Sequence, residues 1–204
     1  MSSLKGIGRL VPLAILALSA ACERLTGHAV RDWSQDVALD DGRTIVIDRH
    51  VEFDSSNSMA GDAYSVRETR STISFRGDLA TLPKWDFDLR PLVLYQDSVT
   101  SEWVVVATTT NCDTWRAWYE PPLAYWEFRL SGPAWSERYP LFEASFGRLT
   151  NLFTGYESGV PSKHVTTALT RQYTDHAGID RDYRSIRQDA GTNCSKDTNP
   201  KTRN

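Results

Sequence analysis

Apolar and polar residues alternate over residues 33–53, which is the pattern of strands with one buried face. Val37 and Ile45 lie on either side of Asp40-Asp41-Gly42, a sequence typical of turns. A three-residue loop, with Gly42 in the left-handed conformation, pairs Val37 with Ile45 and gathers the apolar side chains on one face. A two-residue loop would put the isoleucines on the opposite face, so we predict a β-hairpin closed by the longer loop.

Further strands are predicted after a polar segment over residues 54–63, which we expect to be an exposed loop. Alternating or apolar runs predict strands at 73–75, 92–95, 103–109 and 126–130, with a connection over 77–91. Residues 103–109 are apolar at nearly every position, which predicts a central strand covered on both faces. In residues 126–130, Glu127 and Arg129 alternate with apolar residues, which predicts one solvent-facing side.

The pattern changes to a helical one after Pro140. Phe142, Phe146, Leu149 and Phe153 recur at helical spacing, which predicts an amphipathic helix that ends near Gly155. Residues 163–176 fit either a helix capped by Ser162 or a strand, because they are rich in threonine. Residues 179–186 predict a last short helix that stops by Gly191.

Together these elements predict a mainly β domain, an antiparallel sandwich or a bent sheet with helices added in the C-terminal third. An α+β arrangement is the alternative. We expect one domain over residues 33–194, followed by a polar, disordered tail over 195–204. Without residues 1–21, the remaining 183 of the 204 residues are long enough for one well-buried domain or for two small ones.

The first 21 residues combine basic residues with a short apolar run. They contain Lys5 and Arg9 and no acidic residue, and residues 10–21 are apolar or small. A helix needs about 20 apolar residues to span a bilayer, so this run is too short for a permanent anchor and is typical of a secretory signal peptide. Leu18-Ser19-Ala20-Ala21-Cys22 then resembles the lipobox of bacterial lipoprotein precursors, although Leu18 lies four residues before the cysteine, where three is commoner in the class.

This resemblance implies a lipid anchor. In the class, the cysteine thiol receives a diacylglyceryl group, signal peptidase II cuts before the cysteine, and the new amino group is acylated, with palmitate as the usual label. Glu23 follows Cys22, and the absence of Asp there implies an outer-membrane destination facing the periplasm. Two or more acyl chains hold a protein to a membrane stably. We therefore expect residues 1–21 to be removed and residues 22–32 to form a short lipidated tether.

Charge and cysteine content limit which partners and which cellular compartment the sequence favours. Without residues 1–21 the chain has 21 Lys+Arg and 26 Asp+Glu, a net charge of −5, with both signs interspersed. This distribution argues against a nucleic-acid partner. If Cys22 carries lipid, Cys112 and Cys194 remain as a pair, and in an oxidising compartment we predict a disulfide between them.

Aromatic residues are concentrated after residue 101. Trp115, Trp118 and Tyr119 lie beside Cys112 and the rigid Pro121-Pro122 sequence. Aromatic rings stack on sugars and are enriched at protein interfaces, so these three residues are candidates for ligand binding. The alternative is that they pack in the core around the predicted disulfide.

Catalytic and metal-binding motifs are missing from the sequence. It has no Gly-x-Ser-x-Gly or His-Glu-x-x-His sequence and no glycine-rich phosphate loop, and we expect His50, His164 and His176 to be surface residues. We therefore expect no cofactor, no metal and no enzyme activity.

Three hypotheses follow, and the first is a lipid-anchored binding or accessory module for an envelope protein partner. The second is a peptidoglycan-binding or other glycan-binding lipoprotein that uses the aromatic residues beside Cys112. The third is a cell-wall hydrolase. A polar cleft with two convergent carboxylates, or with a His–Asp pair, would favour that third hypothesis.

Overall fold

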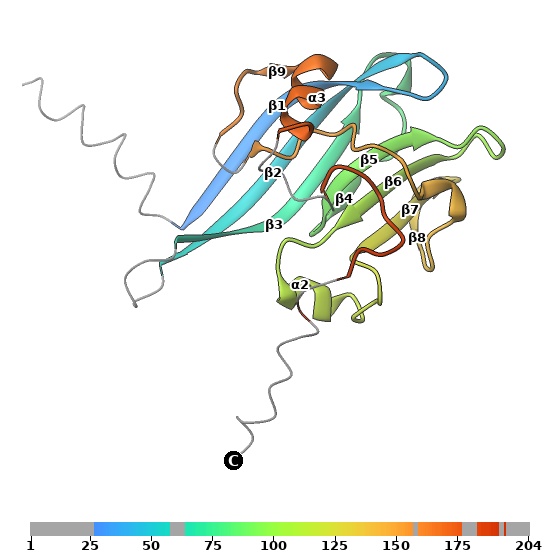
Figure 1. Cartoon of the computed structure of the whole chain (residues 1–204). Helices are drawn as coiled ribbons and strands as arrows, with labels where there is room; N and C mark the ends of the chain where they lie inside the picture. Colours follow the sequence, from blue (N-terminus) through green and yellow to red (C-terminus); the bar gives the residue numbers. More distant parts are fainter. Residues whose placement is uncertain (1–26, 58–63, 157–158, 177–182, 192–193, 195–204) are drawn as a thin grey trace, which may run out of the picture.

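The computed structural model describes residues 27–57, 64–156, 159–176, 183–191 and 194, which form two β-sheets (Figure 1). The first sheet has the strand order β4-β3-β2-β1-β9 and the second has the order β5-β6-β7-β8. The strands are β1 (His28–Ala38), β2 (Thr44–Asn57), β3 (Tyr64–Phe75), β4 (Trp85–Phe87), β5 (Arg90–Gln96), β6 (Trp103–Thr108), β7 (Tyr125–Ser131), β8 (Ala134–Arg138) and β9 (His164–Val165). All neighbours are antiparallel except β1 and β9, so the predicted mainly β, antiparallel fold is confirmed.

The main hydrophobic core lies between the two sheets. Ile47 of β2 and Phe128 of β7 are fully buried there. A second cluster covers the other face of the second sheet, where Leu141 and Ile186 belong to the same group as Val104 of β6. Strand β6 is therefore buried on both faces, as its apolar sequence predicts.

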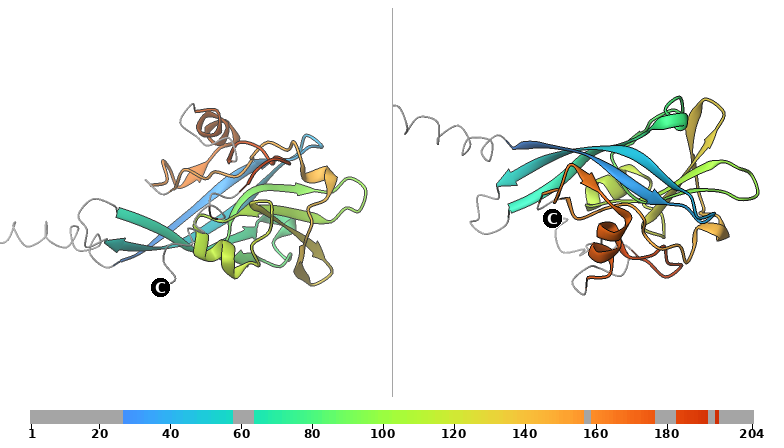
Figure 2. Two further views of the ribbon diagram at one scale, coloured as in Figure 1. Left: turned by 60° about the horizontal axis from the view of Figure 1, so that its bottom comes forward. Right: turned by 90° about the horizontal axis from the view of Figure 1, so that it is seen from above.

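Strands β1, β2 and β3 are longer than their partners in the second sheet. The N-terminal end of β1, the C-terminal end of β2 and the N-terminal end of β3 project beyond that sheet (Figures 1 and 2). The inner face of this region is packed against α3 (Thr167–Thr174) and the segment before it, with Trp33 and Phe53 in one cluster with Phe153 and Tyr156.

The opposite face of β1–β3 is the outer face of the first sheet, and its side chains are half-buried or exposed. It consists of Asp32, Ser34 and Asp36 of β1, Asp48, His50 and Glu52 of β2, and Thr72 and Ser74 of β3. Each of these residues alternates with a buried one along its strand, which is the two-residue period of a sheet with one buried face. The described residues provide no layer over this face.

The first hairpin has the predicted register. Val37 pairs with Ile45, and Ala38 pairs with Thr44. Gly42 has a φ angle of 84°, in the left-handed region where a side chain would be strained. The three-residue loop is confirmed, because only this register places the apolar side chains of both strands toward the core.

One side of β7 was predicted to face solvent, and this prediction was wrong. Glu127 and Arg129 are 0% and 3% exposed. The Nε atom of Arg129 donates to Glu127 at 2.6 Å, and the backbone N–H of Phe142 and the hydroxyl of Ser145 donate to the other oxygen of Glu127. The chain after Pro140 therefore returns over this face, and its hydrogen bonds replace water around the charges.

The prediction of a helix over residues 142–153 was also wrong. The chain forms only a short 3-10 turn, η2 (Glu143–Ser145), and is then extended. The backbone N–H groups of Asn151 and Leu152 both donate to the carbonyl of Leu92, and the Asn151 side chain bonds both backbone groups of Leu94. This edge of β5 competes for the backbone donors that a helix would use internally, so tertiary pairing overrides the helical spacing.

The structure decides the open prediction for residues 163–176, but it describes only part of the predicted last helix. Residues 163–176 form the two-residue strand β9 followed by helix α3, whose N-cap is Thr166 and not Ser162. In the predicted last helix, residues 179–182 lie outside the described residues. The following residues are not α-helical, and Ser185 forms a bridge to Leu149.

The predicted boundaries of the N-terminal elements also change. Strand β1 begins at His28, within the predicted tether, because its residues pair with β2 from that position onward. Strand β2 continues to Asn57, so the predicted loop over 54–63 begins later, and residues 58–63 lie outside the described residues. The signal peptide over 1–21, Cys22 and the tail over 195–204 also lie outside them.

Candidate functional site

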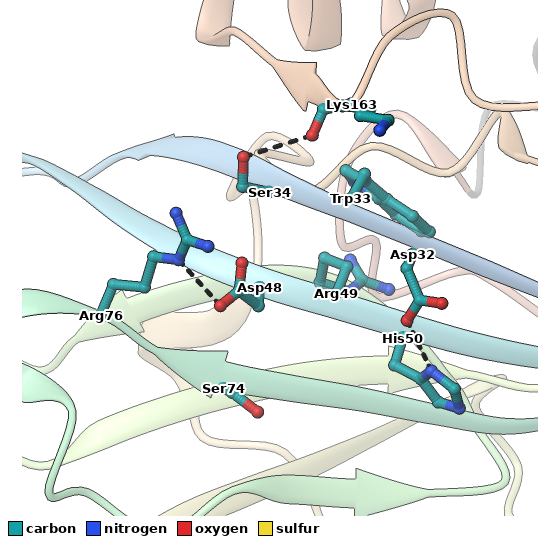
Figure 3. A pocket seen from close by; sticks show the side chains of 9 residues that line it. All are labelled: Asp32, Trp33, Ser34, Asp48, Arg49, His50, Ser74, Arg76 and Lys163. Atoms are coloured by element: carbon teal, nitrogen blue, oxygen red, sulfur yellow. Dashed lines mark hydrogen bonds and ion pairs between the residues drawn. The ribbon is translucent and has the colours of Figure 1, made fainter.

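A shallow depression of about 450 Å³ lies on the outer face of the first sheet (Figure 3). The residues that line it are Asp32, Trp33, Ser34, Asp48, Arg49, His50, Ser74, Arg76 and Lys163. Asp32, Asp48 and His50 project from the near side of the strands, whereas the side chains of Trp33 and Arg49 point to the far side (Figure 3). The depression therefore has a charged surface supported by rigid strands.

His50 is held between two carboxylates. Its Nδ1 atom lies 2.7 Å from Asp32 on β1, and its Nε2 atom lies 3.2 Å from Glu52 on its own strand. The hydrogen bond to Asp32 is the main cause that raises the pKa of His50 above its ordinary value, and Glu52 adds to it. Ionised carboxylates only accept hydrogen bonds, so both ring nitrogens can donate only when each carries a proton. This environment therefore favours the imidazolium form of His50.

Two other arginines of this face are paired with carboxylates, whereas Lys163 has no ion pair among the described residues. Arg76 donates from Nε to Asp48 at 2.8 Å, across β3 and β2. Arg70 is paired with Asp86 of β4, and this guanidinium is the main cause that lowers the pKa of Asp86. Lys163 is exposed and, within the part of the chain that the structure describes, its ammonium has no ion pair.

Beside the depression, His164 of β9 links a hydroxyl to a carboxylate. Its Nδ1 atom lies 2.7 Å from the hydroxyl oxygen of Ser34, and its Nε2 atom lies 3.1 Å from Asp36. The pairing of β9 with β1 fixes this arrangement, because Ser34 and His164 are register partners. Ser34 and Asp36 are two residues apart on one strand, so both face the imidazole.

Beneath the outer face, the interior holds a cluster of charged and aromatic residues. The side chain of Arg49 is 1% exposed, and its guanidinium carbon lies 5.2 Å from the ring centre of Trp33. Its Nη2 atom donates to Ser71, but its Nε and Nη1 atoms have no hydrogen-bond partner among the described residues. Burial lowers the pKa of Arg49 and raises that of Tyr156. The cluster is closed to solvent and belongs to the core.

A larger cleft of about 900 Å³ lies between α3, the first hairpin and residues 147–151. Arg148 on its wall forms an ion pair with Asp40 and lies over the ring of Tyr95. Arg171 and Asp175 of the α3 region are 3.9 Å apart. These pairs fix the walls of the cleft and neutralise much of their charge, so we assign no ligand to it.

The structure separates the three aromatic residues that the sequence suggested as a binding site. Trp115 is 6% exposed and its Nε1 atom donates to the carbonyl of Pro121, so it is part of the core. Trp118 is half-buried and donates to Asp88, and its ring packs on those of aromatic neighbours in the core. Tyr119 alone presents an exposed ring, at 87%. The three rings therefore do not form one flat platform.

Cys112 and Cys194 are brought together, with their sulfur atoms 2.11 Å apart and their Cα atoms 5.3 Å apart. Cys112 begins α2 (Cys112–Ala117), so the end of the described chain is held against the helix that follows β6. This geometry agrees with the predicted disulfide.

Within the described ranges, no group of three or more His, Cys, Asp or Glu side chains is placed to hold a metal ion. The described helices also include none that is long and apolar enough to cross a membrane. Comparisons of the chain with protein-family models, curated proteins and solved structures found no match.

The His–carboxylate contacts were missed by sequence reasoning. His50 and His164 were expected to be surface histidines, and they are partly exposed, but each also binds carboxylates. Ser34 and Asp36 share a face because they are two residues apart on one strand. No local pattern could show that His164, 130 residues from Ser34 in the sequence, would lie against both.

Proposed function

We propose that the protein is a cell-envelope lipoprotein, anchored through lipid on Cys22, and that its domain binds an envelope protein partner through the outer face of the first sheet. The observation that carries the proposal is that this face is uncovered and that its charged side chains are ordered. No described segment covers it, and ion pairs between neighbouring strands hold its charged side chains in place. Charges that are ordered before binding favour recognition of a complementary surface.

The distance between the lipid and the domain supports this proposal. Cys22 lies six positions before His28, where β1 begins. Six residues reach at most about 20 Å when fully extended. A lipidated Cys22 would keep the outer face close to the membrane surface, within reach of a membrane-associated partner. A disulfide between Cys112 and Cys194, whose sulfur atoms are adjacent, would form in an oxidising compartment such as the periplasm.

The anchor is tested by palmitate labelling. We expect the wild-type chain to incorporate labelled palmitate and to fractionate with membranes, and we expect Cys22→Ala to lose both properties. A wild-type protein without label would contradict the proposed anchor. Separation of inner and outer membranes in the same experiment tests the outer-membrane destination that Glu23 implies.

The binding face is tested by site-specific photocrosslinking in intact cells. A photoreactive residue at Ser74, within the depression, should form an adduct with one envelope protein. The same residue at Val99, which is 89% exposed in the loop between β5 and β6, serves as the matched control. Equal adducts at both positions would argue against a specific face.

A charge-swap variant sharpens this test. Exchanging the partners of one ion pair, as Asp48→Arg with Arg76→Asp, retains the pair and inverts its direction on the surface. The fold should keep its stability within about 1 kcal/mol, because exposed pairs contribute little. The adduct at Ser74 should fall at least about tenfold, since like charges then oppose each other at the interface. An unchanged adduct would exclude this pair from the binding face.

Glycan binding is a second candidate, carried by the exposed ring of Tyr119. Its φ angle is 66° and that of Glu120 is 50°, so the chain turns sharply and displays the ring on the surface. Titration with soluble muropeptides should quench or shift aromatic fluorescence if this ring stacks on sugar. Glycan binding that survives Tyr119→Ala would exclude the residue as the contact.

A further inference from the structure

We propose that Ser34 is an activated nucleophile on the outer face, with His164 as its general base and Asp36 as the residue that positions His164, and that this group cleaves small carboxylic esters. The proposal goes beyond partner binding and does not depend on it. Its geometric basis is the pair of contacts at the imidazole, 2.7 Å to Ser34 and 3.1 Å to Asp36. Nucleophilic serine sites require a hydroxyl, a base within hydrogen-bond reach and a third group that orients the base.

The carboxylate of Asp36 selects the tautomer of His164 that can act as a base. An ionised carboxylate only accepts hydrogen bonds, so the Nε2 atom that faces Asp36 carries the proton. In the neutral imidazole, Nδ1 then has a free electron pair, and this pair is directed at the hydroxyl of Ser34. The hydroxyl oxygen lies 2.7 Å from Nδ1 and 3.3 Å from the carbonyl oxygen of Lys163, so its one proton has two acceptors. Donation to Nδ1, the closer of the two, is the arrangement needed for proton transfer during attack.

The backbone holds the three groups without a flexible loop. Ser34 and Asp36 lie on β1, between residues paired with β2, and His164 is the register partner of Ser34 on β9. The N–H of Ser34 also donates to the carbonyl of Lys163 at 3.0 Å, which fixes the two strands at this point. Groups on paired strands keep their separation better than groups on loops.

The surroundings of Ser34 suit a small ester. Ser34 lines the depression of about 450 Å³, which is open enough to admit a small acyl group. Lys163 lines the same depression, and its ammonium has no ion pair among the described residues. It therefore adds a positive charge to the depression in which negative charge develops on the carbonyl oxygen.

The reaction balances without a metal or a redox partner. The oxygen of Ser34 attacks the carbonyl carbon while its proton passes to Nδ1 of His164. Collapse of the tetrahedral intermediate breaks the bond to the alcohol oxygen, which takes the proton from His164, and an acyl-serine remains. Water, deprotonated by His164, then attacks the acyl group, the acid leaves, and the proton returns to Ser34.

His28 is the matched control on the same face. Its Nδ1 atom lies 3.2 Å from the carboxylate of Asp54, and it is not among the residues that line the depression. Replacing it removes a histidine–carboxylate pair from the outer face without removing a base that serves a nucleophile. A loss of activity caused only by the loss of such a pair would therefore appear in His28→Gln as well as in His164→Gln.

The test uses the full-length protein in detergent with two probes, a fluorophosphonate and p-nitrophenyl acetate. We expect the fluorophosphonate to label Ser34, identified by mass spectrometry of the peptide. Ser34→Ala and His164→Gln should lower the hydrolysis rate at least tenfold, whereas His28→Gln should leave it within twofold. Asp36→Asn should lower kcat with little change in KM, because Asp36 does not touch the substrate.

Three results would overturn the proposal: no labelling of the folded protein, labelling at another residue, or equal hydrolysis by wild type and Ser34→Ala. Urea denaturation of each variant shows whether a loss reflects unfolding, and a folded Ser34→Ala variant is expected because the residue is only half-buried. The crosslink at Ser74 should persist in Ser34→Ala. Failure of hydrolysis with an intact crosslink therefore rejects only the nucleophile, and loss of the crosslink alone rejects only partner binding.

Discussion

Glu68 of β3 and Arg90 of β5 form a buried ion pair of 2.9 Å that joins the two sheets. Their side chains are 1% and 7% exposed. The hydroxyl of Tyr156 donates to the same carboxylate at 2.9 Å. The carboxylate of Glu68 thus links β3 to β5 and to the segment that contains Tyr156, three segments that are far apart in the sequence.

Replacing Glu68 should destabilise the fold strongly. Glu68→Gln removes the negative charge that Arg90 and Tyr156 share, and so weakens two buried contacts at once. We expect the free energy of unfolding to fall by about 3 kcal/mol, measured by urea denaturation. Asp54→Asn removes an exposed partner of His28 and should cost less than about 1 kcal/mol. Equal losses in the two variants would contradict the structural role of Glu68.

The Cys112–Cys194 pair should stabilise the domain by closing a long loop. The two residues are 82 positions apart, and the loop-entropy relation gives on the order of 4 kcal/mol for a loop of this length. Thiol counting on the denatured, unreduced mature protein should find no free thiol. Cys112→Ser combined with Cys194→Ser should lower the urea midpoint to the value of the reduced wild type. Two reactive thiols in the unreduced protein would refute the disulfide.

His50 should titrate above its ordinary pKa of about 6.5. The hydrogen bond to Asp32 is the main cause, so Asp32→Asn should lower the pKa of His50 in an NMR titration of the ring protons. Since the pKa is higher in the folded state, the contact stabilises the fold fully below about pH 6.5, and this stabilisation is lost as pH rises through the folded pKa. Its size should stay below about 1 kcal/mol, because both groups are partly exposed. An unchanged midpoint in Asp32→Asn would exclude Asp32 as the cause.

Gly155 should tolerate no side chain. A Cβ atom at this position would lie 2.2 Å from the ring of Tyr173 in α3, so Gly155→Ala must displace the ring or the helix. Overpacking of this kind costs about 1–3 kcal/mol, which urea denaturation would detect. Gly191→Ala is the control, because a Cβ there meets nothing within 4 Å. If the two variants were equally stable, the packing of α3 against this segment would be wrong.

The predictions from sequence succeeded where the determining interactions are local. The register of the first hairpin follows from alternation and from one glycine in the left-handed conformation. The central position of β6 follows from its continuous apolar sequence. These features depend on residues within a few positions of one another, so the sequence alone contains the information that fixes them.

Only the tertiary structure decided which surfaces are covered and which distant side chains meet. Phe142 and Leu149 have helical spacing, yet the chain from Gly147 onward is extended. Its backbone donors bond to the carbonyls of residues 184 and 186 and to Leu92 of β5. Glu127 lies on a face that alternation assigns to solvent, yet a returning segment buries it. His164 reaches Ser34 through the pairing of β9 with β1. In each case the outcome depends on a contact between segments far apart in the chain, and periodicity within one segment carries no information about its distant partner.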